Sequence, residues 1–187
     1  MTEPSAVCGV FFLLMTMLLA RGEIQINEED IVQFWNTTEL IWTTFTTSRE
    51  RHFCKVDRKV DINECNITFY RGHIEHRMWH IEKYDGTFRH FYNESAAVFD
   101  AVKIKSAGRR ARATEVLQYQ SNDSTCAVFW ILTSDGYQLT PSYDLRIKDS
   151  YIKKILLKTA NAGNPSRNAT RQKKYRRYYR NCQAVLH

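Results

Sequence analysis

An acid and a base, Asp144 and Arg146, stand two residues apart near the end of the segment CAVFWILTSDGYQLTPSYDLRI, residues 126–147. Alternating apolar residues on both sides of Asp135-Gly136 are typical of a β-hairpin, and residues two apart in a strand share a face. If this face lines an interior, the pair forms a polar anchor in an aromatic pocket, where the planar guanidinium favours a carboxylate ligand. If the face lies on the exterior, the pair is a surface ion pair worth under about 1 kcal/mol.

Aromatic side chains are the candidates for the wall of such a pocket. Phe129 and Trp130 lie on opposite faces of one expected strand, so only one of them points inward. Ordinary core packing is the alternative explanation for each aromatic residue. Together with the acid and the base, the candidate ligand-binding residues are Trp42, Tyr70, Trp79, Tyr119, Phe129, Asp144 and Arg146.

Three histidines, His73, His76 and His80, have the side chain of a metal ligand. His76 and His80 share a strand face but lie about 13 Å apart along it, which is too far for one ion. Without a carboxylate or thiol to complete a tetrahedral set, the sequence predicts no metal site. It contains no Gly-x-Ser-x-Gly motif, and its cysteines are expected in disulfides, so we expect no catalytic residues, no cofactor and no enzymatic activity.

The first residues of the chain have the composition of a targeting signal. Val7–Leu19 is an apolar run too short to span a bilayer, and Ala20 and Gly22 form a small-x-small cleavage pattern. We interpret residues 1–22 as a signal peptide and residues 23–187 as a single secreted domain with a basic C-terminal segment, 167–187. No second apolar run is long enough for a stable membrane anchor. Five sequons agree with an extracellular glycoprotein: Asn36, Asn66, Asn93, Asn122 and Asn168.

The basic C-terminal segment accounts for the formal net charge of +7, because seven Lys or Arg and no acid lie between Arg167 and Arg180. A solvated basic face is the plain interpretation of such a run. A glycosaminoglycan, an anionic membrane surface or an acidic host protein would suit it as a partner. Nucleic acid is not expected as a partner of a secreted chain.

The pattern of apolar residues predicts a domain made mostly of strands. Residues 28–45 begin as a short helix and pass into a threonine-rich stretch typical of a strand, and residues 151–159 predict a helix packed on the outside. Eight further strands with tight links describe an up-and-down antiparallel barrel or a sandwich, and a barrel of this size holds one small ligand. A turn at Asp85-Gly86 is expected between the third and fourth. These strands are His52–Val56, Asn66–Arg71, Glu75–Tyr84, Thr87–Tyr92, Val98–Lys105, Ala113–Gln120, Cys126–Leu132 and Tyr143–Lys148.

Several segments in combination resemble one known family. The stretch DIVQFWNTTELIWTTFTTSRERHFC, then SNDSTCAVFWIL, then YDLRI and a cysteine near the C-terminus are similar to the tick salivary lipocalins, the histamine-binding-protein family. The resemblance covers essentially residues 23–187. It implies an eight-stranded calyx with a C-terminal helix, secreted in saliva as a monomer. Such proteins sequester a small host mediator, a biogenic amine such as histamine or serotonin or a lipid such as a fatty acid, eicosanoid or sterol, and so suppress inflammation and immunity.

The resemblance also implies roles for single residues. Amine-binding members carry an acid where this chain has Ala127, which favours Phe129 over Trp130 as the inward aromatic residue. A buried ammonium needs a carboxylate partner, so the missing acid and the added Arg146 favour a lipid slightly over an amine. Trp42 matches the family's tryptophan at the closed end of the barrel.

Four cysteines lie beyond the signal segment, Cys54, Cys65, Cys126 and Cys182, an even number that favours two disulfides. The sequence alone leaves three connectivities open. The family-like disulfide joins Cys54 to Cys182. Cys126 lacks the family's usual downstream partner, so Cys65 is assigned to it by elimination, with free thiols as the alternative.

Two functions therefore compete. The first is a scavenger that encloses a mediator in its calyx. The second is an immune-modulating protein that acts through its outer surface on a host protein or a glycosaminoglycan, with the calyx incidental.

Overall fold

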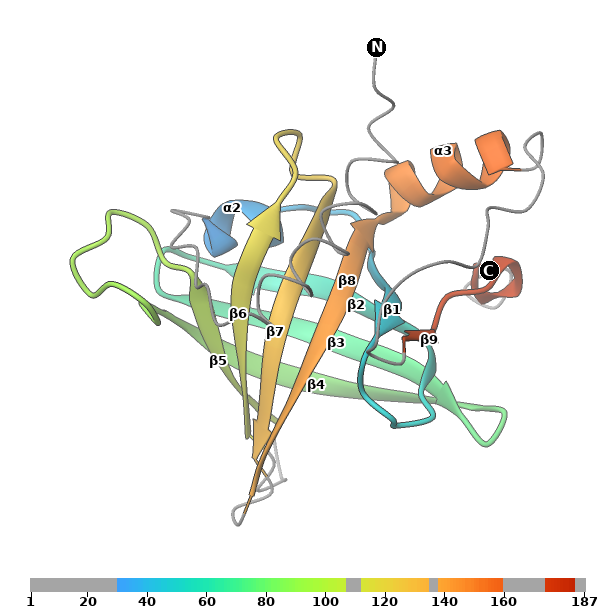
Figure 1. Ribbon diagram of the computed structural model, residues 1–187, viewed down its shortest axis with the longest axis horizontal. Helices are drawn as coiled ribbons and strands as arrows, with labels where there is room; N and C mark the ends of the chain where they lie inside the picture. Colours follow the sequence, from blue (N-terminus) through green and yellow to red (C-terminus); the bar gives the residue numbers. More distant parts are fainter. Residues whose placement is uncertain (1–29, 107–111, 135–137, 160–173, 184–187) are drawn as a thin grey trace.

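A computed structural model of the chain describes residues 30–106, 112–134, 138–159 and 174–183. Strands β2 to β8 pair consecutively and antiparallel, and β1 pairs with both β8 and β2, which closes a barrel of eight strands (Figure 1). The expected antiparallel barrel is confirmed, and the sandwich is excluded. The strands are β1 (Ile41–Thr46), β2 (Phe53–Ile62), β3 (Asn66–Glu75), β4 (Met78–Arg89), β5 (Ala101–Ser106), β6 (Arg112–Gln120), β7 (Cys126–Ser134) and β8 (Leu139–Lys148).

In the described part of the chain two α-helices accompany the barrel, as the sequence predicts. α2 (Ile31–Trp35) begins after Asp30, whose carboxylate accepts hydrogen bonds from the first backbone N–H groups of the helix. It buries three of its five side chains and closes one end of the barrel. α3 (Asp149–Thr159) follows β8 directly and lies outside the barrel wall (Figure 1).

The expected turn at Asp85-Gly86 is wrong, because β4 runs unbroken through both residues. Gly86 serves packing instead of turning: a Cβ atom there would lie 2.7 Å from the Val102 side chain and 2.8 Å from that of Ile67. The chain reverses earlier, at His76 and Arg77, which both adopt positive φ angles of 50° and 66°. A turn of this kind usually carries Gly or Asn, so the sequence gives little sign of it.

A short ninth strand seals the seam between β1 and β2. These two strands pair only through Ile41 and Trp42, and beyond that point β9 (Tyr175–Arg176) pairs with β1. The next residue, Arg177, donates its backbone N–H to the carbonyl of Thr44 and accepts a hydrogen bond from the backbone N–H of Cys54. The described part of the C-terminal segment, residues 174–183, is therefore part of the wall, and it includes the 3-10 helix η1 (Arg180–Cys182).

Apolar side chains form two separate clusters, one on each side of the wall. The inner cluster fills the half of the barrel next to α2, and the outer cluster lies between the wall, α3 and the C-terminal segment. The inner cluster contains Ile31, Phe34, Trp35, Ile41, Ile67, Phe69, Phe88, Val102, Ile104, Leu117, Ala127, Phe129 and Ile131. The outer cluster contains Trp42, Cys54, Val56, Cys126, Val128, Leu145, Ile147, Tyr151, Ile152, Tyr178 and Cys182.

Candidate ligand-binding site

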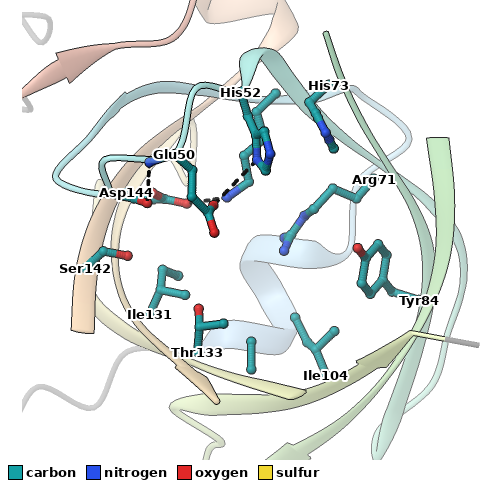
Figure 2. A pocket seen from close by; sticks show the side chains of 13 residues that line it. Glu50, His52, Arg71, His73, Tyr84, Ile104, Ile131, Thr133, Ser142 and Asp144 are labelled. Atoms are coloured by element: carbon teal, nitrogen blue, oxygen red, sulfur yellow. Dashed lines mark hydrogen bonds and ion pairs between the residues drawn. The ribbon is translucent and has the colours of Figure 1, made fainter. Parts of the chain in front are cut away.

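A cavity of about 190 Å³ opens at the end of the barrel opposite α2. Figure 2 looks into it, with α2 behind the side chains that line it. Ile104 and Ile131 supply an apolar side, whereas Arg71, His73 and Asp144 supply a polar one. A small molecule bound there would meet both kinds of surface, as in most ligand sites.

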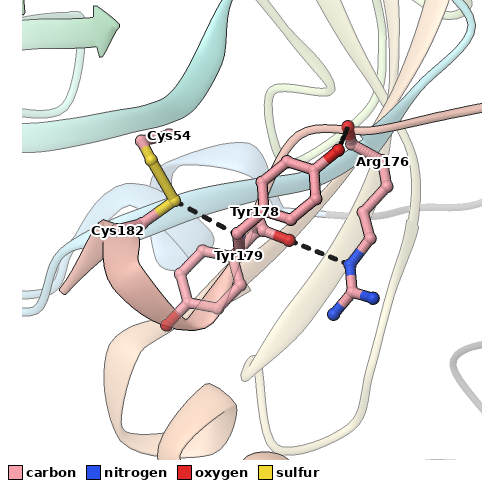
Figure 3. The surroundings of a disulfide bond; sticks show 5 residues. All are labelled: Cys54, Arg176, Tyr178, Tyr179 and Cys182. Atoms are coloured by element: carbon pink, nitrogen blue, oxygen red, sulfur yellow. Dashed lines mark hydrogen bonds between the residues drawn. A yellow bond between two sulfur atoms is a disulfide. The ribbon is translucent and has the colours of Figure 1, made fainter. Parts of the chain in front are cut away.

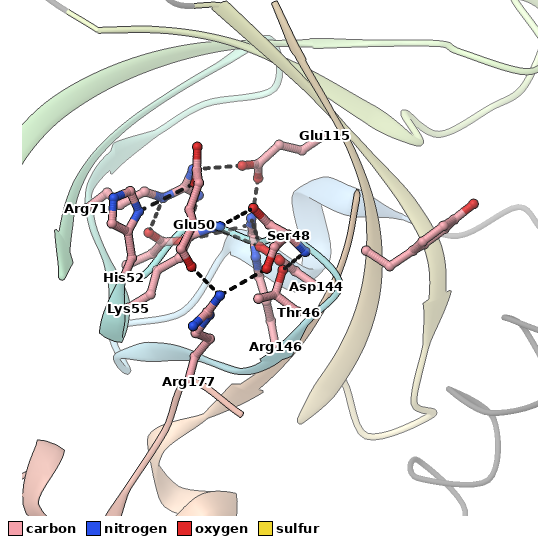
Figure 4. A network of polar contacts seen from close by, with 12 residues as sticks. Thr46, Ser48, Glu50, His52, Lys55, Arg71, Glu115, Asp144, Arg146 and Arg177 are labelled. Atoms are coloured by element: carbon pink, nitrogen blue, oxygen red, sulfur yellow. Dashed lines mark hydrogen bonds and ion pairs between the residues drawn. The ribbon is translucent and has the colours of Figure 1, made fainter. Parts of the chain in front are cut away.

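The floor of the cavity is a network of buried charges with Arg71 at one side (Figure 4). The Arg71 guanidinium donates from Nε and Nη2 to the two oxygens of Asp57, at 2.6 and 2.8 Å. Its Nη1 donates to Oε1 of Glu115 at 2.8 Å. The two side chains that Arg71 joins are at most 1% exposed, so these contacts are made away from water.

Arg146 connects this half of the network, through Glu115, to a second half formed by Asp144 and Lys55. Its Nη1 donates to Oε2 of Glu115 at 2.6 Å, and its Nη2 lies 3.4 Å from Oδ2 of Asp144. The same Asp144 oxygen accepts a hydrogen bond from Nζ of Lys55 at 2.8 Å. Counting Asp57 and Arg71, three carboxylates face three cations, so the formal charge of the network is zero.

Aromatic rings hold the two guanidinium groups from below. The Arg146 guanidinium lies 4.4 Å from the ring centre of Phe129 and 5.7 Å from that of Trp35. That of Arg71 lies 5.1 Å from the ring centre of Phe69. These cation–π contacts fix the planes of both guanidinium groups at the boundary between the inner cluster and the cavity.

The charges of the network shift the acid–base behaviour of its carboxyl groups. Burial alone would raise the pKa of the Glu115 carboxyl, but Arg146 and Arg71 outweigh burial and hold this pKa far below its usual range. Burial likewise acts to raise the pKa of Asp144, and Lys55 and Arg146 together lower it below its usual value. Both groups are therefore ionised in the folded protein at neutral pH.

Acid is expected to destabilise the protein through these two carboxylates. Their pKa values are lower in the folded than in the unfolded chain, so their stabilisation is complete above the unfolded pKa of about 4. It is lost as the pH falls toward the folded values. Urea unfolding measured from about pH 7 down to about pH 3 is expected to show a falling free energy of unfolding below about pH 5. The fall should be smaller in Glu115→Gln, and equal falls in both proteins would contradict the assignment.

Histidines lie at the rim of the cavity. His52 and His73 stack with their ring centres 3.9 Å apart, and His80 stacks on the other side of His73 at 5.5 Å. Burial, followed by the effect of His52 and His80, lowers the pKa of His73 to about 4. The His73 imidazole is therefore neutral at neutral pH.

Comparison with known proteins gives matches by structure. No family model and no curated protein sequence matches the chain. The crystal structure of AM182 in complex with serotonin aligns with a TM-score of 0.55 and 13% identity, over 86% of this chain and 95% of that one. Japanin from Rhipicephalus appendiculatus bound to cholesterol aligns at 0.42 and 9%, over 69% and 89%. The possum milk whey lipocalin trichosurin with 4-ethylphenol aligns at 0.41 and 12%, over 69% and 91%.

This chain is a closed barrel of eight antiparallel strands with a helix after β8, and its alignment with the AM182 structure covers most of both chains. The fold is that of a lipocalin. None of the described helices has the length and apolar character needed to cross a membrane.

The lipocalin barrel places three of the candidate ligand-binding residues inside. Asp144 lines the cavity, which decides between the two faces left open for this acid and its neighbouring base. Arg146 is fully buried beneath the cavity, and both of its Nη atoms are engaged by carboxylates, so it offers no free fork to a ligand. Phe129 points inward below Arg146, whereas Trp130 contacts Phe91 on the outside.

The other four candidates are not among the residues that line the cavity. Trp42 belongs to the outer cluster, where its Nε1 donates to Asp149 at the start of α3. Trp79 and Tyr119 pack against the same cluster, and Tyr70 is 43% exposed. Strand alternation explains most of this, and an irregular register between Leu117 and Tyr119 turns the latter outward.

The expected disulfide between Cys54 and Cys182 is present (Figure 3). The expected partnership of Cys65 with Cys126 is wrong, because Cys65 is a free, exposed thiol in the turn between β2 and β3. Cys126 is buried in the outer cluster and is disulfide-bonded, but none of the described cysteines is its partner. Among the sequons, Asn36, Asn66, Asn93 and Asn122 are exposed, and Asn168 lies outside the described residues.

The sequence analysis missed most of the charged network. Its candidates did not include four charged residues of the network, Lys55, Asp57, Arg71 and Glu115. Each of them lies in a strand and shares a face with an apolar or charged residue two positions away, which was a weak sign of an inward position. Glu115 carried the clearest signal, since a carboxylate between inward-facing neighbours requires a cation inside the barrel. The cation that pairs with Glu115 comes from another strand, and the sequence does not show which strand lies beside it.

Proposed function

We propose that this lipocalin is a secreted scavenger that encloses a small host mediator in its cavity and thereby suppresses host inflammation and immunity. The single observation that carries the proposal is the cavity itself, which opens to solvent at one end of a barrel whose other end is closed by α2. The predicted signal peptide and the disulfide between Cys54 and Cys182 support an extracellular location. The neighbours AM182, Japanin and trichosurin were each crystallised with a small molecule.

The size and charge of the cavity favour a compact amine over a lipid. Its 190 Å³ lies below the range of about 300–1,000 Å³ typical of pockets for drug-sized molecules, so a sterol or a long fatty acid fits poorly. The preference for a lipid expected from Arg146 loses its basis, since this guanidinium is engaged by Glu115 and Asp144. An amine the size of serotonin or histamine is the mediator that we favour.

Asp144 is the acid we assign to the ammonium group of such an amine. The ammonium of Lys55 lies 2.8 Å from Oδ2 of Asp144. The Lys55 side chain is 21% exposed, whereas that of Asp144 is 2% exposed, so the lysine is the partner that can withdraw. A bound amine would take the place of the lysine ammonium and keep the network neutral.

Replacing Lys55 with alanine separates the two ligand classes by the sign of its effect. An amine should bind more tightly to Lys55→Ala, by about tenfold, because it no longer displaces an ammonium that makes a charge-assisted hydrogen bond of about 1.5 kcal/mol. A fatty acid or eicosanoid should bind more weakly, because the variant has lost a cation. Isothermal titration calorimetry with serotonin, histamine and arachidonate, in buffer treated with a metal chelator, measures all three affinities.

Lys83→Ala is the matched control, because Lys83 is exposed on the outside of β4 and should leave every affinity unchanged. Weaker amine binding in Lys55→Ala would overturn the assignment of Asp144. If the wild-type protein bound no amine, fatty acid, eicosanoid or sterol, the scavenger function would be overturned. The alternative would then be a function of the outer surface, with a host protein or a glycosaminoglycan as partner.

A further inference from the structure

Three side chains with metal-binding atoms meet at the rim of the cavity. His73 and Glu75 lie two residues apart on one face of β3, and His52 stands just before β2. The pairing of Phe53 with Ile74 places His52 directly beside this pair. One ligand atom from each of His52, His73 and Glu75 lies within 4.8 Å of the other two.

The contacts of His52 give it the environment of a metal ligand. Its Nε2 lies 3.8 Å from Oε1 of Glu75, and its Nδ1 lies 3.5 Å from Oε2 of Glu50. Histidines that bind a metal through one ring nitrogen commonly donate the N–H of the other to a carboxylate, which orients the ring. Glu50 is placed to orient the His52 ring in this way, and Glu75 is placed to bind the metal directly.

Charge and mobility also permit a cation at this position. Lys55 and Arg71, which line the same cavity as His52 and His73, are already paired with carboxylates of the buried network. The ligand atoms must approach to about 3.3 Å from one another for bonds of 2.0–2.1 Å in a tetrahedral site. The side chains of His52 and Glu75 are 29% and 38% exposed, so they have room to rotate toward His73.

We propose that His52, His73 and Glu75 bind one divalent transition-metal ion, Zn²⁺ or Cu²⁺, at the rim of the cavity. Two imidazoles and one carboxylate are a donor set that suits these ions. The sequence analysis weighed His73 with His76 and His80, and it considered neither His52 nor Glu75. Glu75 shares a face of β3 with His73, and the β2–β3 pairing brings His52 beside both. The proposal does not depend on which mediator the cavity holds.

Titration of the tag-free, full secreted protein with ZnCl₂ at neutral pH tests the proposal. The wild-type protein is expected to bind one Zn²⁺ per chain, and His52→Ala and His73→Ala are each expected to weaken binding by at least about tenfold, since even outer-shell changes cost 10–100-fold. Glu50→Gln should have a smaller effect than Glu75→Gln. His76→Asn is the matched control, because His76 is an exposed histidine in the β3–β4 turn whose positive φ angle asparagine tolerates.

Two further readouts keep the test decisive. The visible absorption of bound Co²⁺ should change in the three ligand variants and stay unchanged in His76→Asn. Circular dichroism checks that each variant folds. If His73→Ala does not fold, Glu75→Gln still tests the site, because Glu75 is partly exposed and its replacement should not disturb the fold. No saturable site in the wild-type protein, or equal affinity in Glu75→Gln, would overturn the proposal. The serotonin titrations in chelator-treated buffer are independent of this result.

Discussion

Replacing Glu115 with glutamine is expected to lower the free energy of unfolding by about 3–5 kcal/mol. The Glu115 side chain is fully buried, and its two oxygens accept hydrogen bonds from Arg71 at 2.8 Å and Arg146 at 2.6 Å. Glutamine keeps the volume but removes the negative charge, so two buried guanidinium groups then face each other without the anion between them. Urea unfolding followed by tryptophan fluorescence measures the loss.

The matched control is Glu64→Gln, which removes an exposed carboxylate in the β2–β3 turn and should change stability by less than about 0.5 kcal/mol. The double variant Glu115→Leu with Arg146→Met is expected to be more stable than Glu115→Gln, although it changes more atoms. Its remaining charges form two complete ion pairs, Arg71–Asp57 and Lys55–Asp144. If the double variant were the less stable of the two, the cost would come from lost packing and not from an unpaired charge.

Removing the disulfide in the double variant Cys54→Ala with Cys182→Ala is expected to cost about 4 kcal/mol. The bond closes a loop between cysteines 128 residues apart, so it restricts the unfolded chain strongly. In the folded protein it ties η1 to β2 beside Tyr178 (Figure 3). The Tyr178 ring packs against Trp42, with ring centres 5.1 Å apart. Thermal and urea unfolding of the variant under non-reducing conditions measure the loss.

Hydrogen exchange should localise the effect of this variant. The backbone N–H groups at positions 54 and 177 bond across the seam between β1, β9 and β2, so they should exchange faster when the C-terminal segment is untied. The Arg177 side chain donates to the carbonyl oxygens of Ser48 and Glu50 near the cavity, so ligand affinity should fall as well. Cys65→Ser, which changes a free and exposed thiol, is the control expected to do nothing. Equal melting temperatures for the two variants would contradict the role given to the disulfide.

Local patterns were enough for most of the fold. Alternation of apolar and polar residues predicted the strands that became β3 and β6 to β8, and the apolar run after β8 predicted α3. The error at Gly86 has a physical cause, because a glycine that permits close packing looks the same in sequence as one that permits a turn. Trp42 and Trp79 were misplaced because apolar residues cover the outside of this wall as well as its inside.

By itself, the sequence predicted a domain made mostly of strands and placed Asp144 and Arg146 on one face, and the resemblance to known proteins added the barrel and the disulfide between Cys54 and Cys182. These depend on residues close together in the chain or on a resemblance to known proteins. Only the tertiary structure decided that the shared face is the inner one and that Arg146 is engaged by Glu115. Residues in the network are 31, 44 and 89 positions apart, and no local pattern chooses among such partners. The closed barrel selects these partners, because a charge buried inside it is stable only beside a charge of opposite sign from a neighbouring or facing strand.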